Sequence, residues 1–115
     1  MISAFGVVMR KIRTNTGDSL RTCATKLGIT ATFLSAMEVG RKSIPNYYPE
    51  KIKELYALTD EEYIDLLIQT EKNDKKPGCS ERIEGLLILK KQKKILRESY
   101  EKKNTQLNDI TKFID

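Results

Sequence analysis

The sequence predicts an all-α protein in which five short helices precede a C-terminal helical extension. Apolar residues recur at intervals of three and four along most of the chain, as on the buried side of a helix. No stretch shows the strict apolar–polar alternation of a half-buried strand. The chain has 115 residues. The pattern indicates one small domain over 1–72, a polar linker over 73–79 that contains Pro-Gly, and a helical segment over 80–115.

The first two helices are delimited by glycines and by a capping serine. The first is expected over about 4–14, and the segment Asn15-Thr16-Gly17 ends it. Ser19 offers a side-chain cap to the second helix, and Gly28 follows it, where a left-handed residue costs glycine nothing. The residues expected to face the core are Phe5, Val8 or Met9, and Ile12 in the first helix, and Leu20, Cys23, Ala24 and Leu27 in the second.

The next three helices are also marked by their first residues. Thr30 caps a third helix, which Gly40 stops. Pro49 suits the first turn of a fourth helix. Thr59 and Glu62 have the spacing of a capping box that opens a fifth. The residues expected to point inward from these helices are Leu34, Met37, Ile52, Leu55, Tyr56, Tyr63, Leu66 and Leu67.

Charge is distributed unevenly along the chain. The whole chain has 21 Lys and Arg against 16 Asp and Glu, which gives a net charge of +5. Residues 1–53 carry nine basic and three acidic side chains, residues 54–72 carry one and six, and residues 73–115 carry eleven and seven. A basic N-terminal half beside an acidic segment predicts a surface with an electrostatic orientation.

The residue types present argue against catalysis and against a metal site. There is no His, and the two Cys, Cys23 and Cys79, do not make a disulfide framework or a zinc site. We expect Cys23 to be a small core residue. The chain has no Gly-rich phosphate loop, so we expect neither an enzyme nor a cofactor. No apolar run approaches the roughly 20 residues of a membrane helix, and no signal-peptide pattern opens the chain. We therefore expect a cytoplasmic protein that does not bind membranes.

Residues 19–40 hold the pattern on which the functional prediction depends. Two short helices are expected here, joined by a turn of about three residues, and the second is amphipathic, which is the helix-turn-helix arrangement. Ala24 is small where the two helices cross, and Gly28 permits the left-handed turn. Burial of Leu34 and Met37 would leave the residues at the start of the second helix projecting outward.

Four stretches carry a more specific pattern: "FGVVMRKIR", "GDSLRTCATKLGIT", "ATFLSAMEVGRKSIP" and "KIKELYALTDEEYIDLL". They combine Ala24-x-x-x-Gly28 with Phe33-Leu34-Ser35 and Glu38-x-Gly40, followed by Arg41-Lys42. Through these stretches, the segment from residue 5 to about residue 67 resembles the Cro/cI-type (XRE) helix-turn-helix family of bacterial and phage regulators. The resemblance implies a five-helix, lambda-repressor-like DNA-binding domain.

The resemblance also implies a buried ion pair and a set of DNA contacts. It places Arg13 of the first helix against Glu38 of the third, and a buried Glu38 would otherwise lack a partner. It places DNA contacts at the start of the third helix and in the loop after it. The candidate DNA-binding residues are Ser19, Arg21, Thr30, Ala31, Thr32, Ser35, Ala36, Arg41, Lys42 and Ser43.

Two of these candidates depart from the family pattern. Related regulators often carry Gln, Arg or Asn at the positions of Ala31 and Ala36. Alanine cannot make a bidentate bond to a base, although it can contact a thymine methyl group, and Thr or Ser can bond to several base edges. We therefore expect little direct base readout, with phosphate contacts and DNA shape contributing the rest.

The segment 80–115 lies outside the resemblance. A heptad assignment that starts at Leu86 makes seven of nine a and d positions apolar, with lysines at 93 and 103. Three outcomes remain open: a dimer-forming coiled coil, a helical hairpin broken at Asn104-Thr105, or packing against the first domain through Ile83, Leu86, Leu87 and Leu89. The candidate dimerisation residues are Leu86, Leu89, Leu96, Tyr100, Leu107 and Ile110.

Two functions remain open at this stage. The first is a sequence-specific DNA-binding transcriptional regulator that binds double-stranded DNA as a homodimer, a repressor of bacterial or mobile-element origin. The second is a protein-binding regulator, such as an antitoxin or an inhibitor of a host defence nuclease. Its segment 80–115 would bind another protein, and its helix-turn-helix domain would serve autoregulation. The alanines at positions 31 and 36 motivate the second reading.

Overall fold

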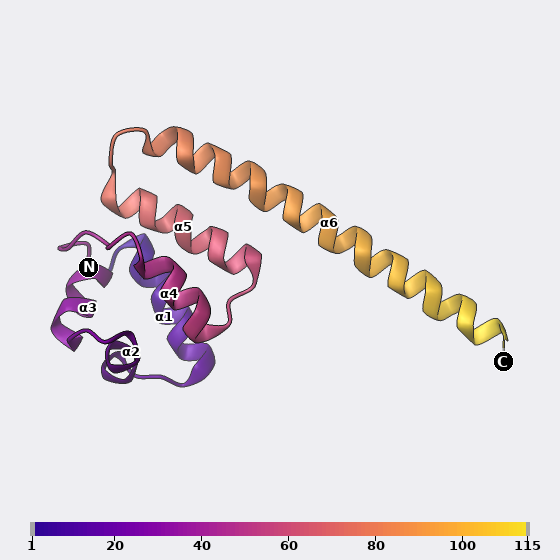
Figure 1. The fold of residues 1–115 in the computed structure, drawn as a ribbon, viewed down its shortest axis with the longest axis horizontal. Coiled ribbons are helices and arrows are strands. Elements are labelled where there is room, and N and C mark those ends of the chain that lie inside the picture. The colour runs from indigo at the N-terminus through magenta and orange to yellow at the C-terminus, as the bar shows by residue number, and fades with distance from the viewer. Residues whose placement is uncertain (1, 115) are drawn as a thin grey trace.

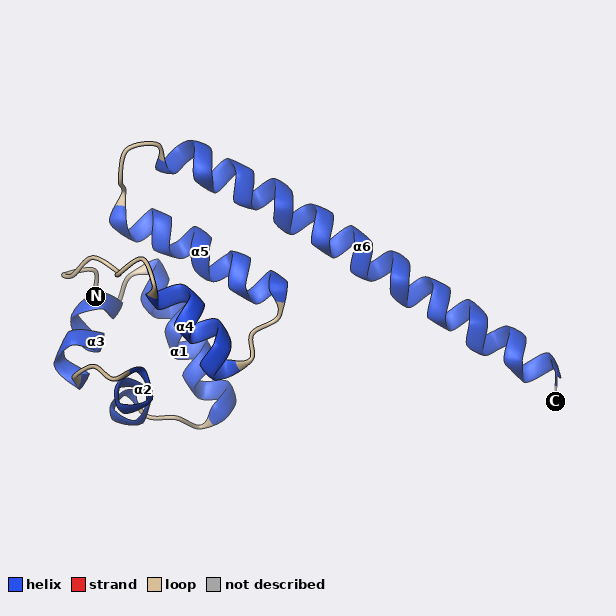
Figure 2. Cartoon of the chain, viewed as in Figure 1, coloured by secondary structure: helices blue, strands red, loops and turns tan. Residues whose placement is uncertain are grey.

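A computed structural model describes the backbone of residues 2–114 and the side chains of residues 2–101. The secondary structure of this part of the chain consists of α-helices, with no strand, as the sequence predicts (Figures 1 and 2). None of its helices is long and apolar enough to cross a membrane. The helices are α1 (Ala4–Thr16), α2 (Leu20–Leu27), α3 (Ala31–Glu38), α4 (Tyr48–Tyr56), α5 (Asp60–Asp74) and α6 (Cys79–Ile114).

The predicted helix starts are confirmed. The hydroxyl oxygens of Ser19, Thr30 and Thr59 each accept a hydrogen bond from the backbone N–H three residues later. The Glu62 carboxylate accepts in return from the backbone N–H of Thr59, which completes the capping box. Pro49 lies in the first turn of α4. These termini depend on local chain chemistry, which is why the sequence predicts them well.

The core lies between the first five helices. Phe5 of α1 and Tyr48 of α4 pack against each other at its centre, with tilted rings whose centroids lie 6.1 Å apart. Leu55 is not inward-facing as expected, because 43% of it is exposed and the neighbouring Tyr56 takes the inward position. Most of the other expected core residues are buried: Phe5, Met9, Ile12, Cys23, Ala24, Leu27, Leu34, Met37, Ile52 and Leu66.

The C-terminal segment forms one continuous helix. Figure 1 shows α6 running back along α5 and then continuing beyond the other helices. The alternative of a hairpin broken at Asn104-Thr105 is therefore wrong. The linker is also shorter than predicted, because α5 continues to Asp74 and only residues 75–78 separate it from α6. Ile83 and Leu86 are half-buried, whereas Leu87 and Leu89 are exposed.

Ion pairs and two isoleucines hold α6 against α5. The pairs run antiparallel along the two helices: Arg82–Glu71, Lys90–Asp65, Lys93–Asp60 and Arg97–Glu61, at 3.0–3.5 Å. Ile64 and Ile68 are buried on the same face of α5, at helical spacing from these acids. The acidic segment seen in the sequence is thus neutralised within the chain by the basic start of the C-terminal segment.

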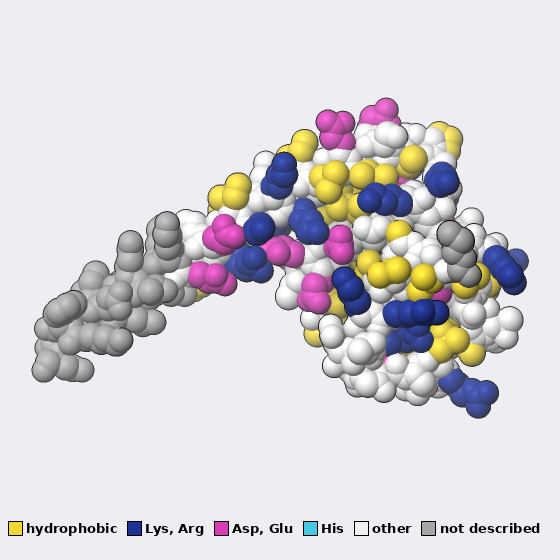
Figure 3. All heavy atoms as spheres, turned by 180° about the vertical axis from the view of Figure 1, so that it is seen from behind, with side chains coloured by type: hydrophobic (Ala, Val, Ile, Leu, Met, Phe, Trp, Pro, Cys, Tyr) yellow, Lys and Arg dark blue, Asp and Glu magenta, His cyan; other side chains and the backbone are white. Residues whose placement is uncertain are grey.

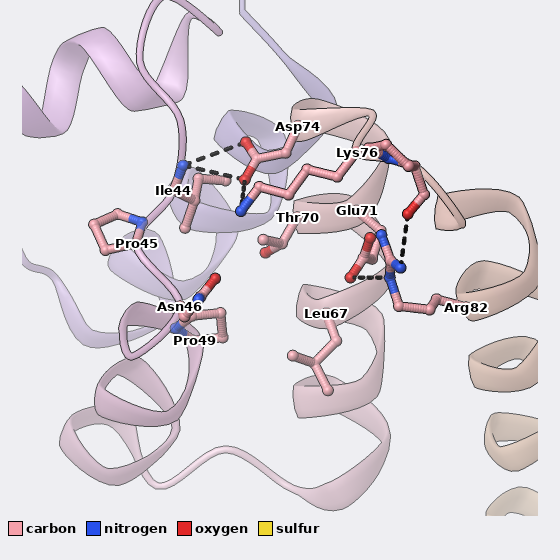
Figure 4. Close-up of a pocket in the computed structure, with 11 residues that line it drawn as sticks. Ile44, Pro45, Asn46, Pro49, Leu67, Thr70, Glu71, Asp74, Lys76 and Arg82 are labelled. Carbon is pink, nitrogen blue, oxygen red and sulfur yellow. Dashed lines mark hydrogen bonds and ion pairs between the residues drawn. The ribbon is translucent and has the colours of Figure 1, made fainter.

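A polar hollow of about 380 Å³ lies where the segment before α4, the end of α5 and the start of α6 meet (Figure 4). Its charged side chains are paired with one another. The Asp74 carboxylate accepts from the backbone N–H of Ile44 and lies 4.0 Å from Lys76 Nζ. Glu71 pairs with Arg82 across the same hollow. These contacts brace the turn between α5 and α6 against the segment that follows α3.

Candidate nucleic-acid interface

The turn between α2 and α3 is held from two sides. Gly28 adopts the left-handed conformation, with φ of 72°, and the N–H of Ile29 donates to the carbonyl of Ala24 at 3.0 Å. From α4, Lys51 Nζ donates to the carbonyl oxygen of Leu27 at 2.6 Å. The last turn of α2 therefore has partners for its carbonyls, and the angle between α2 and α3 is fixed.

The outer face of α3 carries small side chains. Thr32 and Ser35 are exposed, and Ala31 and Ala36 are half-buried. This face forms a shallow hollow lined by Leu20, Ala31, Thr32, Ser35, Ala36, Val39 and Arg41. The hollow thus brings together residues of α2, of α3 and of the loop after it. The hydroxyls of Ser19 and Thr30 have structural roles, because each caps its own helix.

The loop after α3 is anchored at both ends. Gly40 is left-handed, with φ of 83°, and the N–H groups of Arg41 and Lys42 both donate to the carbonyl of Ala36, at 2.8 and 3.3 Å. The other end is fixed by the buried Ile44, whose N–H donates to the Asp74 carboxylate. The side chains between these anchors, Arg41 to Ser43, are exposed.

Three basic side chains near α3 make no ion pair within the described part of the chain: Arg21, Arg41 and Lys42. Lys26 differs, because its Nζ lies 2.7 Å from Asp18 Oδ2. Figure 3 shows Lys and Arg side chains over the helical body and a mixture of acidic and basic side chains where α6 leaves it. The unpaired positive charge of Arg21, Arg41 and Lys42 is therefore available for an anionic partner beside α3.

Glu38 joins the end of α3 to α1. Its Oε1 lies 2.6 Å from Arg13 Nη2, and the two side chains are 5% and 11% exposed. Burial raises the pKa of Glu38, although Arg13 and then Arg10 favour its charged form. Its backbone carbonyl also accepts from the N–H and the hydroxyl of Ser3, at 2.9 and 2.8 Å.

Sequence reasoning missed two residues of this junction. Ser3 caps α1 by accepting from the N–H of Gly6, so a serine before the first apolar residue was a usable signal. Gly6 itself lies so close to α3 that a Cβ there would overlap the carbonyl oxygen of Glu38. No local pattern announces such a contact, because it depends on how the two helices pack.

The candidate dimerisation residues do not share one surface of the single chain. Leu86 is half-buried beside α5, whereas Leu89, Leu96 and Tyr100 are exposed. Leu107 and Ile110 lie outside the residues whose side chains are described. Packing against α5 therefore takes up part of the predicted heptad face.

Comparisons of the chain with protein-family models, with curated proteins and with solved structures find no match. Among the described residues, no group of three or more His, Cys, Asp or Glu side chains could hold a metal ion.

Proposed function

We propose that this protein is a sequence-specific DNA-binding regulator that inserts α3 into the major groove of double-stranded DNA. The observation that carries the proposal is that α3 exposes a face of small side chains and that the anchored Arg41–Ser43 loop lies beside it. A helix with small outward side chains can approach base edges closely, while the flanking cations contact phosphates. Occupation of a promoter would make it a repressor.

The contacts divide by their chemistry. The hydroxyls of Thr32 and Ser35 can bond to base edges, and the methyl groups of Ala31 and Ala36 can contact thymine methyl groups. The side chains expected to contact phosphates are Arg21, Arg41, Lys42 and Ser43. Because no long polar side chain projects from the middle of α3, specificity would depend strongly on DNA shape.

The buried contacts at both ends of α3 support the same proposal. Lys51 fixes the turn before α3, and the Arg13–Glu38 pair fixes its last turn to α1. A reading helix must be held rigidly, because base contacts depend on its register relative to the phosphates. Two copies would read half-sites about 34 Å apart on one face of the duplex.

Selection of bound duplexes from a randomised DNA library tests the proposal. We expect enrichment of a motif with two related half-sites by the wild-type protein. Ala36→Glu should abolish the enrichment, because it places a carboxylate against the bases and phosphates. Glu54→Gln, on the exposed side of α4, is the control that should retain it. Failure of the wild type to enrich any sequence would contradict the proposal and favour the protein-binding alternative.

A further inference from the structure

The face of α6 that points away from α5 carries an exposed apolar stripe. Residues that contact α5 recur at about seven-residue spacing, as with Lys90 and Arg97. At about 100° per residue, the isoleucines two positions before them lie on the opposite face, and the leucines one position before them lie on its flank. We name this set the outward stripe: Ile88, Leu89, Ile95 and Leu96, which are 53%, 39%, 64% and 67% exposed. Figure 3 shows hydrophobic side chains along this outer edge of α6.

Small and polar residues run beside the outward stripe. Gly85, Gln92 and Ser99 stand seven residues apart, and the isoleucines of the stripe follow the first two by three residues. In a heptad that starts at Gly85, one residue before the frame used for the sequence, the small and polar residues occupy a, the isoleucines d and the leucines e. Gly85 has open space where a Cβ would stand. Another helix can therefore approach this face closely, with the stripe leucines flanking the contact.

Charges on the other flank indicate that the approaching helix is α6 of a second copy in the antiparallel direction. Glu84, Lys91 and Glu98 occupy successive g positions, all are exposed, and none has an ion-pair partner among the described residues. In an antiparallel pair of identical helices, g positions face g positions and e positions face e positions. In a parallel pair, g positions would face the leucines at e, which leaves the charges without partners.

The charges and the leucines together select one antiparallel register. When Lys91 lies opposite Glu98 of a second copy, symmetry makes the reciprocal pair, and Leu89 lies opposite Leu96 on the other flank. A shift of one heptad would instead place Glu84 opposite Glu98 and Lys91 opposite its own copy, which repel. Pairing Lys91 with Glu84 would also satisfy the charges, but it would place Leu89 opposite Arg82. The apolar and charged flanks together therefore select a single arrangement.

We infer that two copies of this chain dimerise through an antiparallel contact between the outward stripes of α6, with Lys91 of each copy opposite Glu98 of the other. This inference rests on the proposed function, which requires two copies of the reading helix. The seam differs from the dimerisation residues expected from the sequence, because Leu86 packs on α5 instead and Ile88 and Ile95 are added. The two helical bodies then lie on opposite sides of the paired α6 helices.

Sedimentation equilibrium of the full chain without DNA tests the inference. We expect a dimer whose dissociation constant rises about tenfold in Lys91→Glu or in Glu98→Lys, because each reversal creates two like-charge pairs. The double reversal K91E/E98K should restore the wild-type value within about threefold, since the pairs re-form. Lys94→Glu, an equal charge change away from the seam, should leave the constant unchanged. A wild-type monomer at all concentrations, or a double variant no tighter than the single ones, would overturn the inference.

Disulfide trapping tests the orientation. In a Cys79→Ser background, neither Lys91→Cys nor Glu98→Cys should form a covalent dimer by itself, whereas an oxidised mixture of the two should. In this register, position 91 of one copy lies about 10.5 Å along the axis from position 91 of the other, too far for a disulfide between two copies of one variant. Covalent dimers from either variant alone, or none from the mixture, would refute the antiparallel register. Because no DNA is present, these outcomes are independent of DNA binding.

Discussion

Arg13 of α1 and Glu38 of α3 form a buried ion pair, with Nη2 and Oε1 2.6 Å apart. The pair stands at the opposite end of α3 from the α2–α3 turn, and it fixes the last turn of the helix that we propose reads DNA. Arg13→Ala should lower the free energy of unfolding by about 3–5 kcal/mol, because it leaves a buried carboxylate without a partner. Urea denaturation against Lys11→Ala, an exposed neighbour, measures this. Equal stability of the two variants would contradict it.

Gly6 should not tolerate a side chain. In Gly6→Ala, the new Cβ would overlap the carbonyl oxygen of Glu38, so α1 and α3 must separate. We expect a loss of about 1–3 kcal/mol in the free energy of unfolding, although alanine is the better helix former. Val7→Ala, at the exposed neighbouring position, provides the control and should change little. A stabilised Gly6→Ala protein would show that the close approach is absent.

Asp18 should make stability depend on pH. Hydrogen bonds from Lys26 and, after it, Tyr56 hold the pKa of Asp18 below its usual 3.8, against the opposing effect of burial. A lowered folded-state pKa contributes stability above the unfolded value, and this is lost as the pH falls through the folded value. The difference in unfolding free energy between wild type and Asp18→Asn should therefore be present at neutral pH and shrink under acid conditions. Glu54→Gln should show no such trend, and a constant Asp18→Asn difference would refute the assignment.

The attachment of α6 to α5 should depend more on apolar burial than on ion pairs. Ile68→Ala should cost about 2–5 kcal/mol, because Ile68 is almost fully buried. Lys90→Ala should cost less than about 1 kcal/mol, because the Lys90–Asp65 pair is partly exposed to solvent. Thermal unfolding of the two variants compares these costs. A larger loss in Lys90→Ala would mean that charge pairing dominates the contact.

Local features of the sequence predict much of this structure. Ser19, Thr30 and Thr59 cap helices because each cap uses a backbone N–H three residues away, which the sequence places unambiguously. The inward positions of α1 to α3 follow from helical spacing in the same way. Such predictions need no knowledge of what lies across the core.

Features that depend on packing between distant segments could not be predicted in this way. Gly6 contacts Glu38, and the N–H of Ile44 donates a hydrogen bond to Asp74. The residues of each pair are thirty or more positions apart in the sequence. The heptad pattern of α6 was visible, but the side of α6 that faces α5 was not, because it depends on which side chains of α5 lie opposite. The sequence of the DNA site could not be predicted either, since the exposure of α3 identifies a binding face and not a base sequence.

Fluorescence anisotropy of the full chain on the enriched duplex and on its scrambled counterpart, across a salt series, measures whether α3 reads DNA sequence. We expect a preference of about 10³-fold or more for the enriched duplex. The observed affinity should also fall steeply with salt, as phosphate contacts require. Arg41→Ala should weaken binding to both duplexes and reduce the salt slope by about one. Equal, weak binding to the two duplexes would contradict the assignment of α3 as a reading helix.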